Sequence, residues 1–146
     1  MAAFCLTGIA VAASSVRGHG RCEGTIRLTP ITATQVDVQI DTTGNITHLG
    51  KSRVSLHSTA DFSGPVPVPV PPSQGVVTAA NGDTISFTLK WAAQTVAGGV
   101  FNVTGPFEVT GGTGRFKGVS GSGNYRGLID TNTGSVKAEI EGLLIR

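Results

Sequence analysis

Apolar and polar residues alternate along most of this 146-residue chain after residue 20, and this pattern constrains the fold more than any other feature. In the segment 35–41, for example, Val36, Val38 and Ile40 alternate with polar residues. A period of two places successive side chains on opposite faces of a β-strand, so that one face of each strand is buried. The sequence therefore predicts about seven to nine strands and no helix, in the segments 21–28, 35–41, 53–57, 76–80, 84–91, 100–104, 106–110, 121–130 and 135–145.

Residues with turn chemistry separate these segments. Asn81-Gly82 lies between two apolar runs and favours a type I′ hairpin. The segments 41–45 and 130–134 combine Asp, Asn, Thr and Gly and favour turns. The segment 64–75 holds five of the seven prolines. Because proline lacks an amide hydrogen, we expect this segment to run outside the sheet as an extended surface stretch, with a docking site for a proline-binding partner as the alternative.

The composition favours one all-β domain. Only 14% of the residues are charged, against roughly 25% in ordinary soluble domains. The frequent turns are compatible with a closed barrel or a two-layer sandwich. Closure removes the edges that a sheet with few charges would leave exposed. We therefore predict a single closed antiparallel β-barrel over residues 21–146.

Residues 1–20 form a separate segment in this prediction, either an apolar N-terminal arm or the remnant of a signal peptide. No Lys or Arg precedes the apolar stretch, so export and a cytoplasmic location both stay open. The spacing of Cys5 and Cys22 excludes a C-x-x-C metal or redox motif, and leaves a disulfide between them or two free thiols. No apolar stretch reaches the roughly 18 residues of a membrane span.

The glycine-rich segment 109–121 reads VTGGTGRFKGVSG. It resembles the turn that allene oxide cyclases share with plant dirigent proteins, in which G-G-x-G-x-F leads to a small residue and a further glycine. The positions that match this pattern are Gly111, Gly112, Gly114, Phe116 and Gly121. The resemblance covers about a tenth of the chain. It implies an eight-stranded antiparallel barrel with a ligand cavity open at one end, and association into homodimers or homotrimers.

Several chemistries have no support in the residue pattern. No G-x-S-x-G motif marks a hydrolase, the three histidines have no ligand spacing, and the glycine-rich segment lacks the G-K-[ST] of a phosphate loop. The 11 Lys and Arg residues are scattered along the chain rather than clustered, unlike the basic face of a nucleic-acid-binding protein. The sequence therefore predicts no cofactor, no metal and no nucleic-acid partner.

A cavity for an apolar small molecule remains. If Glu23 points inward, its carboxylate can serve as acid or base, with Tyr125 as a phenolic donor. Arg27 is then a partner for a substrate carboxylate, and Trp91 a ligand-binding ring. The alternative for Glu23 and Arg27 is that they are solvent-facing charges.

Two functions follow from such a cavity. One is a cofactor-free isomerase or cyclase, as the resemblance to allene oxide cyclases implies. The other is a non-catalytic, exported binding or structural barrel with a filled core. A cavity of about 300 Å³ or more with an inward carboxylate would favour the first function.

Overall fold

The computed structural model describes residues 15–146. Residues 1–14, which include Cys5 and most of the predicted N-terminal arm, lie outside the described residues. Residues 15–20 form the start of the first strand. The elements are β1 (Ser15–Pro30), β2 (Gln35–Ile46), β3 (Gly50–Asp61), β4 (Val68–Thr78), β5 (Thr84–Leu89), β6 (Ala92–Ala97), β7 (Val100–Gly112), the 3₁₀ helix η1 (Gly114–Phe116), β8 (Ser120–Asp130) and β9 (Ser135–Ile145).

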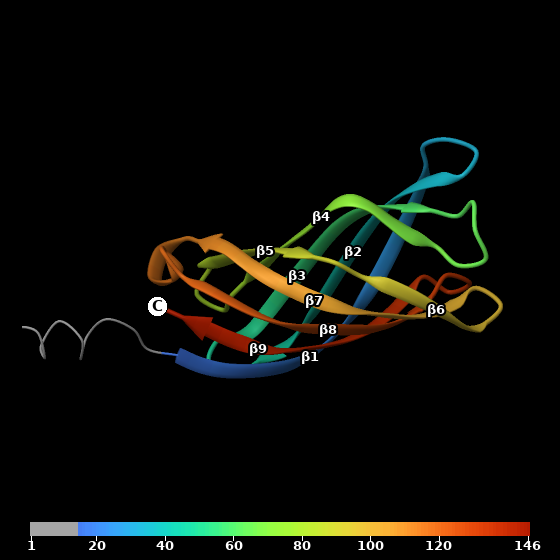
Figure 1. Cartoon of the computed structure of the whole chain (residues 1–146). Helices are drawn as coiled ribbons and strands as arrows, with labels where there is room; N and C mark the ends of the chain where they lie inside the picture. The colour runs from blue at the N-terminus through green and yellow to red at the C-terminus, as the bar shows by residue number, and fades with distance from the viewer. Residues whose placement is uncertain (1–14) are drawn as a thin grey trace, which may run out of the picture.

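Eight of these strands close into an antiparallel barrel, as predicted (Figure 1). The order β5-β4-β3-β2-β1-β9-β8-β7 returns to its start because β7 also pairs with β5. The ninth strand, β6, pairs with the first half of β7, while β5 pairs with its second half. Between β5 and β6, at Lys90 and Trp91, the strand pairing with β7 is interrupted. These two residues lie opposite Gly105 and Pro106 of β7.

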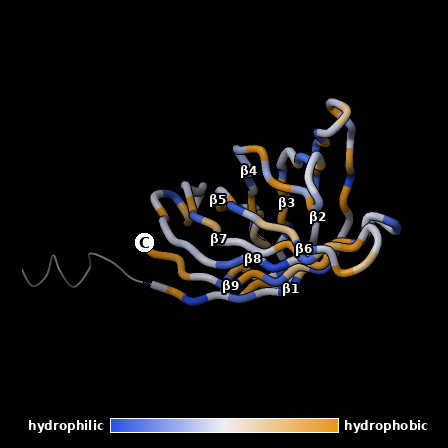
Figure 2. The backbone as a smooth tube through the Cα atoms, turned by 45° about the vertical axis from the view of Figure 1, so that its right-hand side comes forward, coloured by the Kyte–Doolittle hydropathy of each residue, from blue (hydrophilic) through white to orange (hydrophobic). Residues whose placement is uncertain are grey.

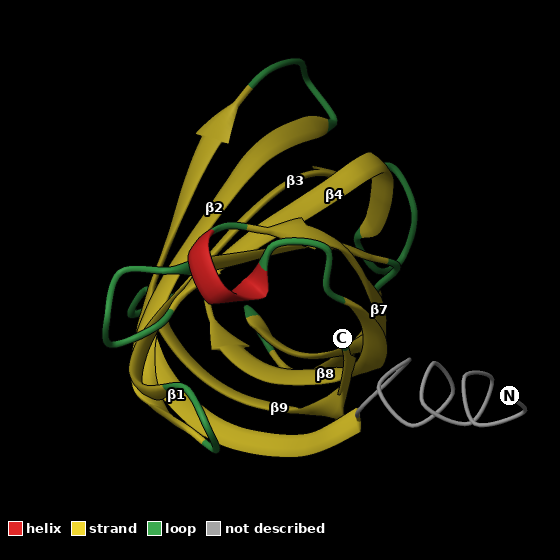
Figure 3. Ribbon diagram, turned by 90° about the vertical axis from the view of Figure 1, so that its left-hand side faces the viewer, coloured by secondary structure: helices red, strands yellow, loops and turns green. Residues whose placement is uncertain are grey.

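The barrel has two different ends. At the first, here called the loop end, lie the connections 31–34, 62–67, 98–99 and 131–134. At the second, the helical end, η1 and its flanking loop lie across the barrel opening (Figure 3). The connections 47–49 and 79–83 also lie there. Within residues 15–146, no helix is long and apolar enough to cross a membrane.

The alternation in the sequence directs apolar side chains into the barrel, and hydropathy changes from residue to residue along the strands (Figure 2). On β5, for example, Ile85, Phe87 and Leu89 are buried while Thr88 is exposed. The final hairpin, β8 and β9, spans the residues predicted for it. Burying such side chains contributes about 1.5–3 kcal/mol each, which is what holds the barrel closed.

The turn expected at 41–45 is wrong, because β2 continues to Ile46. Thr42 faces the interior, where it is buried and its hydroxyl donates to the carbonyl of Val54. The chain reverses instead at Thr47–Leu49, where His48 adopts a φ of 67°. The Thr and Gly residues of this segment are therefore part of strand β2 and do not form a turn.

The proline-rich segment also departs from expectation, because its second part lies in the sheet as the start of β4. Val68–Val70 pair with β3 on one side, while β5 pairs only with Gln74–Thr78. Within residues 15–146, no strand pairs with the first half of β4 on its other side, and such an edge position tolerates a residue without an amide hydrogen.

The hairpin between β4 and β5 is present, but its turn differs from the predicted type I′. Of Asn81 and Gly82, only Gly82 has a positive φ, at 92°. The amide of Gly82 donates to the carbonyl of Ala79, and the amide of Ala79 donates to the carbonyl of Asp83. This is the three-residue loop in which a type I turn is followed by a left-handed glycine.

Candidate functional site

Two apolar cavities lie inside the barrel, one toward each end. The cavity at the helical end, the lower cavity, has a volume of about 70 Å³ and is lined by aliphatic side chains and the rings of Phe87 and Phe107. The cavity at the loop end, the upper cavity, has a volume of about 60 Å³ and is lined by Trp91, Phe101 and further apolar residues. Both are smaller than the roughly 300 Å³ of common small-molecule sites. In the described part of the chain, no Asp or Glu lines either cavity.

The upper cavity reaches the surface at the loop end through a rim of apolar side chains. Leu28 and Phe62 line this cavity and are 37% and 39% exposed. Ile31 and Val68, near the same end, are also exposed. Apolar side chains gathered around an opening are characteristic of binding sites. The loop end is therefore the side from which a molecule can enter.

Tyr125 lies between the two cavities and, among the described residues, is the single one that lines both. It is 3% exposed, and no group within residues 15–146 forms a hydrogen bond with its hydroxyl. Burial raises the pKa of this phenol well above its usual value, and the nearby Cys22 adds to the effect. Tyr125 therefore stays protonated and offers a hydrogen-bond donor to the interior.

A second polar group lies in the wall of the upper cavity. The indole Nε1 of Trp91 donates to the hydroxyl of Ser58 over 3.0 Å. The Ser58 hydroxyl is in turn 2.6 Å from that of Ser73. Ser58 and Ser73 are both buried, and all three residues line the upper cavity. The three side chains form a connected polar cluster in an otherwise apolar wall.

Glu23 and Arg27 do not reach this interior. Both side chains are exposed on the outer face of β1, because Cys22 and Ile26 hold the inward positions. In register, Glu23 lies beside Lys137 of β9 and Thr43 of β2. Roles for Glu23 as an interior acid or base, and for Arg27 as a partner of a buried carboxylate, are therefore corrected to positions on the outer face. Of the four predicted site residues, Tyr125 and Trp91 are the ones that line the two cavities inside the barrel.

The predicted glycine-rich turn closes the helical end of the barrel. Gly111 and Gly112 are the last residues of β7, Gly114 has a φ of 59°, and Phe116 is buried. A tight turn with a left-handed residue and a buried Phe116 is confirmed. Gly121, the second residue of β8, has a φ of 151°.

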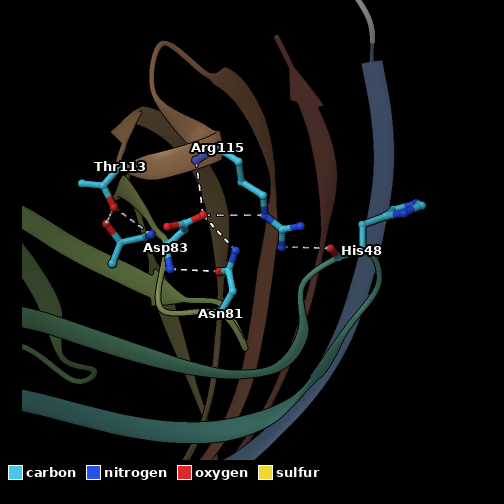
Figure 4. Close-up of polar contacts among 6 residues, drawn as sticks. His48, Asn81, Asp83, Thr113 and Arg115 are labelled. Atoms are coloured by element: carbon cyan, nitrogen blue, oxygen red, sulfur yellow. Dashed lines mark hydrogen bonds and ion pairs between the residues drawn. The ribbon is translucent and has the colours of Figure 1, made fainter.

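Polar contacts attach this turn to the neighbouring loops (Figure 4). The Asp83 carboxylate accepts from the side-chain amide of Asn81 over 2.9 Å and from the backbone amide of Arg115 over 3.2 Å. The guanidinium of Arg115 donates to the carbonyl of His48 over 3.4 Å. The hydroxyls of Thr84 and Thr113 are 2.9 Å apart. The turns at 47–49, 79–83 and 113–119 are therefore joined to one another at the helical end.

The raised pKa of Tyr125 predicts how stability depends on alkaline pH. The unfolded chain loses the phenolic proton above about pH 10, whereas the native state retains it. The free energy of unfolding should therefore fall as the pH rises above about 10. Tyr125 is the only tyrosine of the chain, so phenolate absorbance monitors this residue alone. We expect that signal to appear together with unfolding, as monitored by circular dichroism. Phenolate absorbance that titrates near pH 10 in folded protein would contradict the burial of Tyr125.

Sequence reasoning missed Ser58 and Ser73. On β3, Ser58 is at an inward-facing position, as are Val54 and Leu56. The alternation of the sequence therefore could have predicted that Ser58 points into the barrel. Ser73 had no such signal, because the prolines before it interrupted the pattern. The ladder between β3 and β4 also shifts register between His57 and Thr59, so the pairing of these serines follows from an irregularity of the sheet.

Comparison with known proteins gives a match in structure. No protein-family model matches the chain, and no curated protein matches it in sequence. Among solved structures, the chain is similar to the pterocarpan synthase dirigent protein GePTS1, with a TM-score of 0.60 and 12% identity. The match covers 92% of this chain and 86% of that one. The chain therefore has a dirigent-like fold, an eight-stranded antiparallel barrel with one additional strand.

Proposed function

We propose that this barrel binds a small apolar molecule, which enters at the loop end and occupies the upper cavity beside Tyr125. The observation that carries the proposal is the buried Tyr125 hydroxyl, which lies between two apolar cavities and has no hydrogen-bond partner among the described residues. A buried hydroxyl without a partner costs about 1–3 kcal/mol of stability. A bound molecule with an acceptor would offset that cost, whereas a purely structural core gains nothing from the group.

The size of the cavities does not prevent this role. The upper cavity is bordered by partly exposed Leu28 and Phe62, so a ligand can extend from the cavity into the rim. The side chain of Tyr125 separates the upper from the lower cavity, and its rotation would connect them. The fold neighbour GePTS1 is named as a pterocarpan synthase, which supports a small organic molecule as the occupant.

Binding without catalysis has the better support. An isomerase or cyclase of the expected kind needs an acid or base at the reacting atoms. The described residues that line the two cavities include no carboxylate, and Glu23 lies on the outer face. Tyr125 remains as a donor, which orients a ligand by a hydrogen bond.

Toluene is a suitable first probe, because it is small, neutral and apolar. We expect it to shift the indole N–H resonance of Trp91, the only tryptophan, in a saturable way. Leu28→Glu places a charge at the cavity rim and should weaken toluene binding by roughly tenfold, because the charge loses hydration when the ligand covers it.

Leu128→Glu is the matched control. Leu128 is 43% exposed, close to the exposure of Leu28, but it points outward from β8 and lines neither cavity. Its substitution should change toluene affinity less than about twofold. Non-saturable shifts, or equal losses in the two variants, would refute binding in the upper cavity.

A further inference from the structure

The polar cluster in the upper cavity has a hydrogen-bonding capacity that its own contacts do not use. Trp91 donates to Ser58, and the hydroxyl of Ser58 is within 2.6 Å of that of Ser73. If Ser58 donates to Ser73, the hydroxyl proton of Ser73 has no acceptor among the described residues. If Ser73 donates to Ser58, the oxygen of Ser73 keeps its lone pairs, and Ser58 donates to the carbonyl of Thr59 over 3.4 Å. In either arrangement Ser73 can bond to one further group, as donor or as acceptor.

The surroundings of this cluster contain no counter-charge. Among residues 15–146, no Lys, Arg, Asp or Glu lines either cavity. His57 contributes to the wall of the upper cavity, but its side chain is 60% exposed and its ring nitrogen bonds to Asp37 on the outer face. A carboxylate in the upper cavity would therefore lose its hydration without gaining an ionic partner.

We propose that the Trp91–Ser58–Ser73 cluster is a specificity subsite, which selects neutral apolar molecules that carry a hydroxyl or carbonyl oxygen and rejects carboxylates. The inference rests on the proposed function, because it requires that the upper cavity holds a ligand. Alcohols, phenols and ketones satisfy Ser73 through their oxygen, while their apolar body contacts Trp91 and Phe101. The occupant is thus an oxygen-bearing neutral compound rather than a fatty acid.

Three titrations test this proposal, each followed by the shift of the Trp91 indole N–H resonance. The probes are toluene, p-cresol and 4-methylbenzoate, which share the same apolar ring and methyl group. A purely apolar cavity prefers toluene, because p-cresol must give up hydration of its hydroxyl. With the subsite present, p-cresol should bind at least as tightly as toluene. 4-Methylbenzoate at pH 7 should bind at least roughly thirtyfold more weakly than p-cresol, because an unpaired charge is costly to bury.

Substitution of Ser73 isolates the subsite. Ser73→Ala leaves Ser58 bonded to Trp91 and removes the group that faces the ligand, so p-cresol affinity should fall by roughly three- to tenfold and toluene affinity by less than twofold. Ser55→Ala is the control: Ser55 lies on β3, the strand that carries Ser58, accepts a hydrogen bond from Gln39, and lines neither cavity. It should leave both affinities unchanged. Unaltered thermal unfolding midpoints will show that the variants are folded.

The outcomes separate the two proposals. If toluene itself fails to bind at Trp91, the binding function is refuted. If toluene binds but p-cresol is roughly tenfold weaker, or if 4-methylbenzoate binds as well as p-cresol, the subsite is refuted and the binding function stands. The subsite is also refuted if the p-cresol preference survives Ser73→Ala and disappears in Tyr125→Phe, because Tyr125 would then be the selecting group.

Discussion

A methyl group added at Gly112 should destabilise the protein by about 2–4 kcal/mol, although Ala is a modest substitution elsewhere in a strand. A Cβ at this position would lie 2.6 Å from the carbonyl oxygen of Phe116 and 2.7 Å from that of Thr84. Both neighbours are backbone atoms. The Thr84 carbonyl also accepts a hydrogen bond from Thr113. Relief of the clash therefore requires the end of β7 and η1 to move apart.

Gly111 is the control for this effect, because it is the preceding residue of the same strand and its Cβ would meet no atom within 4 Å. Gly111→Ala should be neutral, or stabilising by up to about 1 kcal/mol through the lower entropy of the unfolded chain. Urea denaturation of both variants gives the comparison. Equal free energies of unfolding for the two variants would mean that β7 and η1 do not approach each other as described.

Phe116→Ala should cost about 3–5 kcal/mol, the usual range for the loss of a buried aromatic ring. Phe116 is 5% exposed, belongs to the hydrophobic core, and has the Arg115 guanidinium carbon 4.7 Å from its ring centre. Its removal would leave a cavity beneath η1, where the polar contacts of Asp83 and Arg115 hold the surrounding loops in place.

Phe62→Ala provides the contrast, since Phe62 is 39% exposed at the loop end. It should lower the free energy of unfolding by only about 1–2 kcal/mol, because more than a third of its surface is already exposed and its removal leaves no enclosed cavity. Thermal or urea unfolding measures both. A small effect of Phe116→Ala would argue that η1 does not close the barrel.

The barrel was predictable because one face of nearly every strand is buried, so that apolar residues recur at every second position of the sequence. The β8–β9 hairpin matches its predicted residues for this reason. The wrong predictions concern residue types that are common in turns but that lie in a strand here. Thr42 and Gly44 have turn chemistry, yet both fit the inward register of β2. A proline-rich segment can join a sheet where only one of its sides pairs with another strand. Which segments have such an unpaired side depends on how the barrel closes, and the local sequence does not show it.

The site was predictable in part. Tyr125 and Trp91 line the interior because they share the register of buried neighbours, Gly127 and Ala93. The same argument, applied to Glu23, places it opposite to Cys22 and therefore outside. The pairing of Ser58 with Ser73 depends on a register shift between β3 and β4, which no local pattern encodes.

The most direct test of the binding proposal is to locate a bound probe. Intermolecular nuclear Overhauser effects should be recorded between toluene and the protein at saturating toluene. We predict contacts to the indole of Trp91, the ring of Tyr125 and the methyl groups of Val103 and Ile129, all of which line the upper cavity. Contacts confined to exposed side chains that line neither cavity, such as Val96 and Leu128, would contradict a ligand site inside the barrel.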